Sequence, residues 1–313
     1  MKLLHRVLPY VAVVAFGVAV FLVYRSVRGY GLAGLLEALH QIPPERLLLA
    51  GACAAGSYLM LTLFDVLAVR ASGHALPYPR VALASFVALS IGHSLGLAPL
   101  GSGALRARYY SRWGLDAESI ARVIVHTTVA VTIGQIVLAG IVLLIEPGPV
   151  AAWTHLGDAM VRLAGAVCLA AVALYVVAAR LLRAPVRIRG WSFKLPRWRI
   201  ALGQVIVGGL NFAFLTGALH LLLSASNPQP FWTTAAIYVL ASVAALISHV
   251  PGGLGVIEFV VLAFLPNAGA FAALIAYRVI YYIIPLAMGG SLLAATELVD
   301  RQAARPAPAP PGA

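Results

Sequence analysis

The segment 248–258, SHVPGGLGVIE, most restricts how this chain can fold. It places one proline and three glycines inside a strongly apolar region, although both residue types disfavour helix interiors. In the hydrocarbon core of a bilayer, such a broken backbone persists only where protein or a water-filled cavity surrounds it. The run that follows, VIEFVVLAFLP, suffices for a helix of roughly 15 Å, half of a bilayer core of about 30 Å. The segment therefore predicts a half-helix that begins at a glycine-rich break, with Glu258 in its first turn.

The rest of the chain is also strongly apolar. Hydrophobic residues make up 62% of the 313 residues, charged residues only 10%, and the mean hydropathy is +0.94, which excludes an ordinary soluble domain. We expect an all-α polytopic membrane protein with seven or eight transmembrane helices. Residues 1–300 would form one integral membrane domain, and the Pro- and Ala-rich residues 301–313 a disordered tail. The candidate spans are 8–24, 47–69, 81–98, 121–145, 159–182, 200–224, 231–249 and 268–297.

The basic residues indicate the orientation of the chain in the membrane. Seven of the 22 lysines and arginines lie in residues 180–199, and such a loop is typical of a cytoplasmic face beside anionic lipid. Segment 81–98 contains two glycines and precedes a proline, which suits a re-entrant element that enters the membrane and returns on the same side. In that case the N-terminus is cytoplasmic; if the segment spans fully, the N-terminus is outside. We favour the cytoplasmic N-terminus.

Two segments resemble each other within the chain. Residues 90–110, SIGHSLGLAPLGSGALRARYY, and 246–260, LISHVPGGLGVIEFV, each place Ser and His at the end of an apolar run. A proline, glycines and a helical run then follow in both. Paired interrupted segments in two halves of a transporter point to a binding site near the middle of the membrane. The pattern predicts two interrupted, re-entrant elements and an internal repeat, although short Gly–Pro patterns also recur by chance.

The motifs PGGLGVIE and PLGSGALRARYYSRWGL, with the many-span layout, resemble the flippase-type transmembrane domain of lysylphosphatidylglycerol synthases. The resemblance extends from about the first expected helix to the last. It implies a bacterial inner-membrane protein that binds or translocates a lipid with an anionic or aminoacylated head group. The synthases also carry an aminoacyl-tRNA-dependent transferase domain, for which this sequence has no counterpart, so we do not expect lysyl transfer. A hopanoid or isoprenoid-linked lipid stays open as a substrate.

An arginine-rich stretch follows the first interrupted segment. Arg108 and Arg112 are four residues apart, so they share one face of a helix, and Arg106 lies close by. A guanidinium binds phosphate through a planar fork of donors, and free N–H groups near Gly101 and Gly103, which precede this helix, could also face an anion. These five residues are the candidate head-group site. The alternative is a cytoplasmic loop that merely follows the positive-inside rule.

The second break supplies a candidate site near the middle of the membrane. A charge at that depth costs about 2.5–3.5 kcal/mol on insertion scales, so Glu258 and Arg278 should face a partner or a wet cavity. Alternatively, Glu258 stabilises a helix N-terminus and Arg278 forms a structural ion pair, with Glu258 itself as a candidate partner. The candidate residues are Pro251, Gly252, Gly253, Gly255, Glu258, Arg278, His93 and His249.

Other polar residues suggest structural roles. Asp65 is expected at the membrane interface, with a buried role as the alternative, and Asn211, Gln135 and Gln204 should form hydrogen bonds between helices. Gly208 would allow close helix approach, and Pro285 should kink the last helix. The two cysteines have neither disulfide nor metal-site spacing, so we expect no metal and no cofactor.

The sequence thus predicts binding and transbilayer movement of a lipid, without catalytic residues. Membrane lipids are the expected partners, with a homo-oligomer or a lipid-synthesis enzyme as further candidates and no nucleic acid. One alternative is a membrane enzyme, or enzyme subunit, that acts on a lipid head group. Another is a scaffold that recruits a cytoplasmic partner through residues 180–199.

Overall fold

The computed structural model describes residues 42–95, 98–182, 195–248 and 255–303, with 186–188, 191–193 and the single positions 37, 40 and 253. The expected first span, 8–24, lies outside these residues. The described elements are α3 (Pro44–Ala71), α4 (Tyr78–Leu95), α5 (Ala98–Arg112), α6 (Ala117–Ile145), α7 (Gly148–Thr154), α8 (Asp158–Leu181), β1 (Val186–Ile188), β2 (Trp191–Phe193), α9 (Trp198–Leu223), α10 (Phe231–Ser248), α11 (Val256–Phe264), α12 (Ala268–Arg278), the π-helix η2 (Val279–Ile283) and α13 (Ile284–Ala303).

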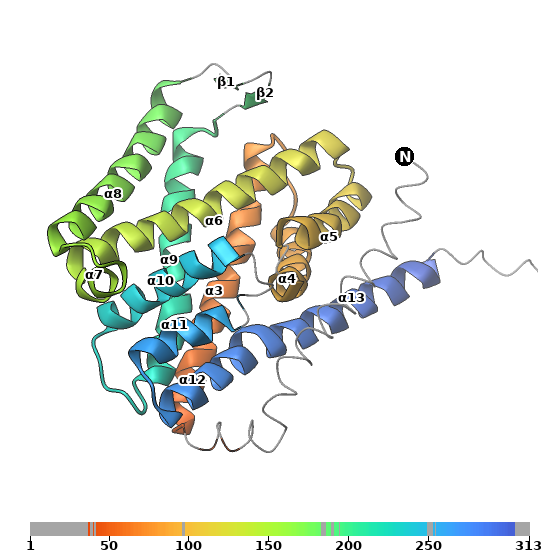
Figure 1. The fold of residues 1–313 in the computed structure, drawn as a ribbon. Coiled ribbons are helices and arrows are strands. Elements are labelled where there is room, and N and C mark those ends of the chain that lie inside the picture. The colour runs from red at the N-terminus through yellow and green to blue at the C-terminus, as the bar shows by residue number, and fades with distance from the viewer. Residues whose placement is uncertain are drawn as a thin grey trace, which may run out of the picture.

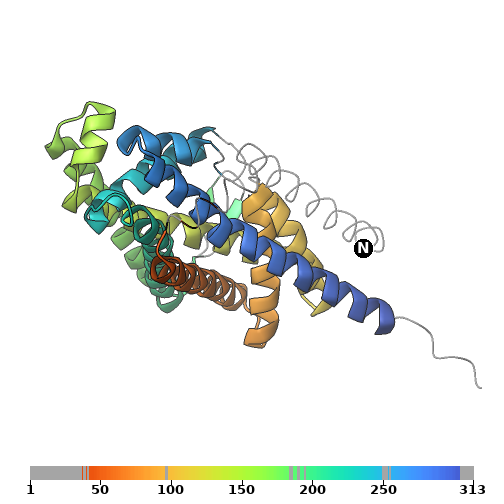
Figure 2. The ribbon, with the colours of Figure 1, turned by 90° about the horizontal axis from the view of Figure 1, so that it is seen from below.

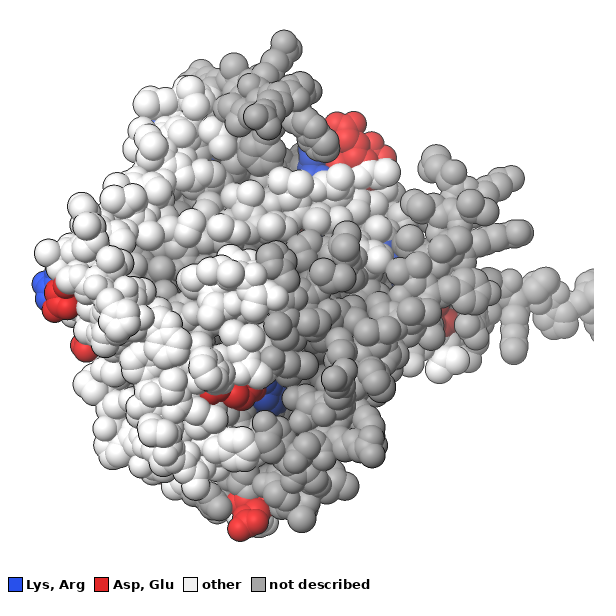
Figure 3. Space-filling model, in the orientation of Figure 1, with Lys and Arg blue, Asp and Glu red and all other residues white. Residues whose placement is uncertain are grey.

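The described part of the chain is a helical membrane bundle (Figure 1). Six helical stretches in it are long and apolar enough to cross a bilayer, so the predicted all-helical, multi-pass class is confirmed. They are Pro44–Ala71, Ala117–Ile145, Asp158–Leu181, Trp198–Leu223, Phe231–Ser248 and Ala268–Val299. A seventh apolar helix, Tyr78–Gly92, is shorter. Among the described residues, the face in Figure 3 carries few charges, as a surface in contact with lipid tails requires.

Two long helices, α3 and α9, pack against each other over much of their length at the centre of the bundle. They run antiparallel, because Arg46 near the start of α3 donates a hydrogen bond to Ser224 at the end of α9 (2.6 Å). Close approach depends on glycine where α6 crosses α9. A Cβ at Gly134 would lie 2.6 Å from the Cα of Gly208, so neither position has room for a side chain. The predicted role of Gly208 is confirmed.

Two pairs of neighbouring helices have short connections. Helices α4 and α5 pack together, and a Cβ at Gly92 would lie only 2.9 Å from the Cβ of Ser102. Helices α10 and α11 also pack together, and the described glycines between them, Gly253 and Gly255, have φ angles of 59° and 79°. These left-handed conformations explain why glycine is required there. As predicted, α11 is a short helix, of nine residues.

Helices α12 and α13 form one continuous rod, joined by the π-helical turn η2 (Figure 2). Pro285 lies just after this turn and cannot donate a hydrogen bond to the carbonyl of Tyr281, four residues earlier. That carbonyl instead accepts a hydrogen bond from the hydroxyl of Tyr58 on α3 (3.3 Å). The rod continues to Ala303, three residues into the expected tail; residues 304–313 lie outside the described part.

The sequence did not predict a β-hairpin between α8 and α9. Strands β1 and β2 pair antiparallel, with Val186 opposite Phe193 and Ile188 opposite Trp191. Next to the hairpin, the guanidinium groups of Arg180 and Arg199 each lie 5.6 Å from the ring centre of Trp198. Trp198 therefore lies beside two cations at the start of α9.

Candidate lipid site

Asp65 lies at the centre of a buried polar cluster, which corrects its expected place at the membrane interface. Its carboxylate is 0% exposed and accepts hydrogen bonds from Arg106 Nε (2.8 Å) and Nη2 (2.9 Å). The hydroxyls of Tyr110 (2.9 Å) and Thr127 (3.0 Å) donate to the same carboxylate. Two helices, α5 and α6, thus supply the donors for one acid on α3. In this structure the guanidinium of Arg106 is hydrogen-bonded inside the protein, and it lines neither of the two cavities described below.

Glu297 on α13 joins the other two arginines of α5. The carboxylate pairs with the buried Arg108 and lies 3.5 Å from Nη2 of Arg112. The side chain of Arg112 is 31% exposed, whereas that of Arg108 is 5% exposed. Of the three predicted head-group arginines, Arg112 therefore offers the most accessible guanidinium.

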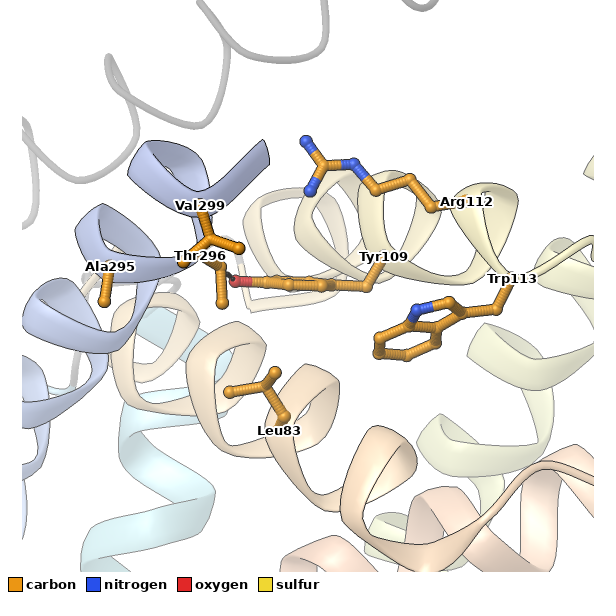
Figure 4. Close-up of a pocket in the computed structure, with 7 residues that line it drawn as sticks. All are labelled: Leu83, Tyr109, Arg112, Trp113, Ala295, Thr296 and Val299. Carbon is orange, nitrogen blue, oxygen red and sulfur yellow. Dashed lines mark hydrogen bonds between the residues drawn. The ribbon is translucent and has the colours of Figure 1, made fainter. Parts of the chain in front are cut away.

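Arg112 lines a cavity of about 470 Å³ between α4, α5 and α13 (Figure 4). The other lining residues are Leu83, Tyr109, Trp113, Ala295, Thr296 and Val299. The hydroxyls of Tyr109 and Thr296 form a hydrogen bond across it (2.8 Å), which joins α5 to α13. A cation, two aromatic rings and apolar side chains in one cavity suit an amphiphile at the membrane interface.

The two glycines of the predicted head-group site lie in a different position from the one expected. Helix α5 begins at Ala98, so Gly101 and Gly103 lie within it and do not precede it. Pro99 does not prevent this start, because proline is tolerated in the first turn of a helix. A Cβ at Gly103 would lie 3.3 Å from Cδ1 of Ile124, so this glycine allows α5 to approach α6.

Glu258 and Arg278 form an ion pair at the second break, as the sequence suggested. Arg278 donates from Nε to Glu258 Oε1 (2.6 Å) and from Nη2 to Oε2 (3.0 Å) and to the carbonyl of Gly253 (3.1 Å). Glu258 also accepts a hydrogen bond from the N–H of Gly255 (2.9 Å), so it caps α11. The side chains are 15% and 12% exposed, and the guanidinium lies 4.7 Å from the ring centre of Tyr282. The pair fixes the broken backbone and still reaches the surface.

A further polar network lies beside this pair; the sequence analysis predicted the interhelical hydrogen bond of Asn211 but missed the other members. The hydroxyl of Ser57 donates to Asn211 Oδ1 (2.8 Å) and forms a hydrogen bond with the hydroxyl of Tyr281 (2.7 Å). Tyr277 stacks on Tyr281, with ring centres 5.4 Å apart. The signal was present in the tyrosine-rich run YRVIYY at 277–282, which is unusual in an apolar helix.

The predicted interhelical hydrogen bonds are confirmed. Gln135 donates to Ser242 (3.0 Å), and Gln204 donates to the carbonyl of His126 (3.3 Å). Of the other predicted site residues, His249, Pro251 and Gly252 lie outside the described part, and His93 is described by its backbone in α4 alone. The described residues contain no cluster of three or more His, Cys, Asp or Glu side chains that could hold a metal ion.

Comparison with known proteins is consistent with this architecture. Residues 12–289 match the model of the family described as "Lysylphosphatidylglycerol synthase TM region". The uncharacterised protein slr0712 of Synechocystis is 34% identical over 88% of this chain and 87% of its own length. The inner membrane protein YbhN of Escherichia coli is 30% identical over 84% of this chain and 80% of its own length. The phosphatidylglycerol lysyltransferase of Staphylococcus haemolyticus is 26% identical over 88% of this chain but only 32% of its own length.

Proposed function

Because this chain belongs to the lysylphosphatidylglycerol synthase transmembrane-region family, we propose that it binds an anionic phospholipid and moves it across the bacterial inner membrane. The Escherichia coli relative is named an inner membrane protein, and the Staphylococcus relative is named for phosphatidylglycerol, an anionic phospholipid. This chain matches 32% of the length of that lysyltransferase, within a family named for the transmembrane region. Lipid binding and movement is the activity that we assign to this region.

The observation that carries the proposal is the position of Arg112 in the wall of the 470 Å³ cavity. A guanidinium can donate two parallel hydrogen bonds to a phosphate. Tyr109 and Trp113 lie beside it, and such rings prefer the depth of lipid head groups. Leu83 and Val299 supply apolar wall for the first carbons below the head group. Arg106 and Arg108 then hold α5 in place through Asp65 and Glu297.

We also propose that the chain contains two related halves, α3–α6 and α9–α13. Each half begins with a long helix, α3 or α9, which a second helix, α4 or α10, follows. A shorter helix, α5 or α11, comes next, and then a helix with a capped N-terminus, α6 or α12. The sequences GSGALR and GLGVIE place Arg106 and Glu258 at the same position of a shared Gly-x-Gly pattern. Asp116 caps α6 through the N–H of Ser119 (3.1 Å), as Asn267 caps α12. In this interpretation, α4–α5 and α10–α11 are equivalent re-entrant hairpins.

The two halves differ in how they enclose their ion pairs, which favours the second half as the midplane site. The Arg106–Asp65 pair is buried, with side chains 3% and 0% exposed. The Glu258–Arg278 pair reaches the surface beside a half-helix and a backbone break. A head group that passes between leaflets needs a polar surface at that depth, and this pair supplies one. Glu258 and Arg278 are therefore the proposed contacts during transfer.

Lipid analysis of the purified protein tests the binding part of the proposal. Wild type, Arg112→Ala and Arg122→Ala would be purified in a mild detergent, and bound lipids compared with those of the source membrane by mass spectrometry. Arg122 is a matched control, because it is exposed and pairs with Glu118 within α6. We expect anionic phospholipid to be enriched in wild type and in the control. The enrichment should fall roughly tenfold in Arg112→Ala, the usual effect of losing a charge-assisted hydrogen bond.

Equal lipid profiles in wild type and Arg112→Ala would refute the head-group site. Translocation needs a separate assay, in vesicles that carry a fluorescent anionic lipid in both leaflets. A membrane-impermeant reductant quenches the outer leaflet, and only lipid that crosses the bilayer is quenched afterwards. Wild-type protein should accelerate this second phase over protein-free vesicles. If the rate of the second quenching phase equals that of protein-free vesicles, the protein binds lipid but does not transport it.

A further inference from the structure

A second cavity, of about 550 Å³, lies between α3, α4 and the η2–α13 part of the rod. Leu48, Gly51 and Phe86 line one side, and Ile284 and Met288 line the other. Among its lining side chains, the one polar group is the hydroxyl of Tyr58, which donates to the carbonyl of Tyr281. A charged or hydrogen-bonding ligand would lose its hydration here without replacement. The chemistry of this wall fits hydrocarbon.

This cavity and the head-group cavity lie along the same two helices. On α4, Leu83 lines the head-group cavity and Phe86, about one turn later, lines the second cavity. On α13, Ala295 lines the head-group cavity and Met288, about two turns earlier, lines the second cavity, so the helical rise places them roughly 10 Å apart. The apolar side chains of Met288, Leu292 and Val299 are exposed along the stretch of α13 that connects the two cavities.

We propose that the second cavity holds an acyl chain of the same phospholipid whose head group lies at Arg112. The inference rests on the proposed function and extends it to the chain. An acyl chain that leaves the head-group cavity along α13 reaches the second cavity after roughly 10 Å. The substrate class is therefore an anionic phospholipid with chains long enough to cover that distance. A phospholipid with two short chains would reach the head-group cavity alone.

Photo-crosslinking of the full-length protein in vesicles tests the chain site. The probe is a phosphatidylglycerol with a diazirine at the end of one long acyl chain, and labelled peptides are identified by mass spectrometry. A phosphatidylcholine with the same diazirine chain reports contacts that do not depend on the head group. We expect the phosphatidylglycerol probe to label α3 near Gly51 and the rod near Met288 more strongly than the phosphatidylcholine probe. Exposed apolar residues of α8, such as Leu163 and Val167, should be labelled equally by both.

A cavity-filling variant and a matched control make the test specific. A Cβ at Gly51 meets no atom within 4 Å, so Gly51→Phe extends into the cavity without a clash at its base. Ala52→Phe adds the same ring on an exposed position of α3 that does not line the cavity. Labelling of the rod near Met288 should fall about tenfold in Gly51→Phe and persist in Ala52→Phe. Thermal unfolding and size-exclusion profiles of both variants would show whether they fold, and Ala55→Phe offers a second lining position.

The outcomes separate this inference from the proposed function. Loss of cavity labelling in both Arg112→Ala and Gly51→Phe supports one lipid that occupies both cavities. If Arg112→Ala loses its bound anionic lipid while wild type shows no head-group-dependent label near Gly51 or Met288, the head-group site stands and the chain site is refuted. If cavity labelling is unchanged in Arg112→Ala, the chain belongs to another lipid and the inference is likewise refuted.

Discussion

Arg106 and Asp65 form a bidentate ion pair inside the bundle, with Nε of Arg106 2.8 Å from Oδ2 of Asp65 and Nη2 2.9 Å from Oδ1. The two residues come from α5 and α3, and the pair ties the short helix to the centre of the molecule. Tyr110 and Thr127 complete the hydrogen bonding of the carboxylate. A buried pair of this kind contributes more to the position of α5 than to a ligand site, because both charges are already satisfied.

Removal of one member of this pair should be strongly destabilising. Asp65→Leu leaves the guanidinium of Arg106 buried without its carboxylate, which costs about 3–5 kcal/mol. The double variant Asp65→Leu/Arg106→Met removes both charges and should recover a large part of that loss. Thermal unfolding of the detergent-solubilised variants measures both effects. Equal stability of the single and double variants would contradict a coupled pair.

The contact between α6 and α9 should not tolerate any side chain at Gly208. A Cβ there would lie 2.7 Å from the Cα of Gly134, so Gly208→Ala forces the two helices apart and should cost about 1–3 kcal/mol. Gly51→Ala is the matched control, since a Cβ at that position meets no atom. The control should unfold at a temperature equal to or above that of wild type, because alanine favours helix. The thermal midpoints of the two variants give the comparison.

Glu258→Gln should separate transport from binding. The substitution removes the negative charge that faces Arg278 but keeps a side chain that can accept the N–H of Gly255. We expect the rate of lipid translocation in vesicles to fall roughly tenfold, whereas the lipid bound at Arg112 is retained. Glu118→Gln is the control, because Glu118 is exposed and pairs with Arg122 on the surface of α6. Normal translocation in Glu258→Gln would exclude this pair from the lipid path.

Asp116 should give a pH-dependent contribution to stability. Hydrogen bonds from the side chain and N–H of Ser119 lower the pKa of this carboxyl below its ordinary value of 3.8. Because the folded state favours the ionised form, the contribution is complete above pH 3.8 and is lost as the pH falls through the lowered pKa. The stability difference between wild type and Asp116→Ala should therefore shrink in acid. Asp116→Asn keeps a capping side chain that does not titrate, so its difference from Asp116→Ala should stay constant with pH.

The helices and the break at 253–255 could be predicted because they depend on local sequence. Apolar runs give the spans, and proline with glycine gives the interruption. Glu258 and Arg278 could be paired in advance because each is the only strong charge in its own apolar run. The structure then supplied the geometry that the sequence could not.

Asp65 was placed wrongly because its environment depends on three helices that are distant in sequence. Its position near the arginine at the end of α3 suggested the interface, but α5 and α6 cover it with Arg106 and Thr127. The start of α5 was also wrong, because Pro99 was treated as a helix breaker although it lies in a first turn. The hydrogen bond from Tyr58 to the carbonyl of Tyr281, within the π-helical turn before Pro285, joins residues far apart in sequence, so no local pattern reveals it.

The continuous rod from α12 to α13 has a mechanical consequence. The 32 residues Ala268–Val299 span about 48 Å, whereas a bilayer core is about 30 Å thick, so the rod must tilt or project from the membrane. Arg278 lies at the start of the π-helical turn, and Thr296 lies in the wall of the head-group cavity, roughly 20 Å beyond that turn. A rotation of about 10° at the turn would move Thr296 by about 3.5 Å relative to Arg112. The rod would thus act as a lever that changes the width of the cavity when the backbone near Arg278 moves.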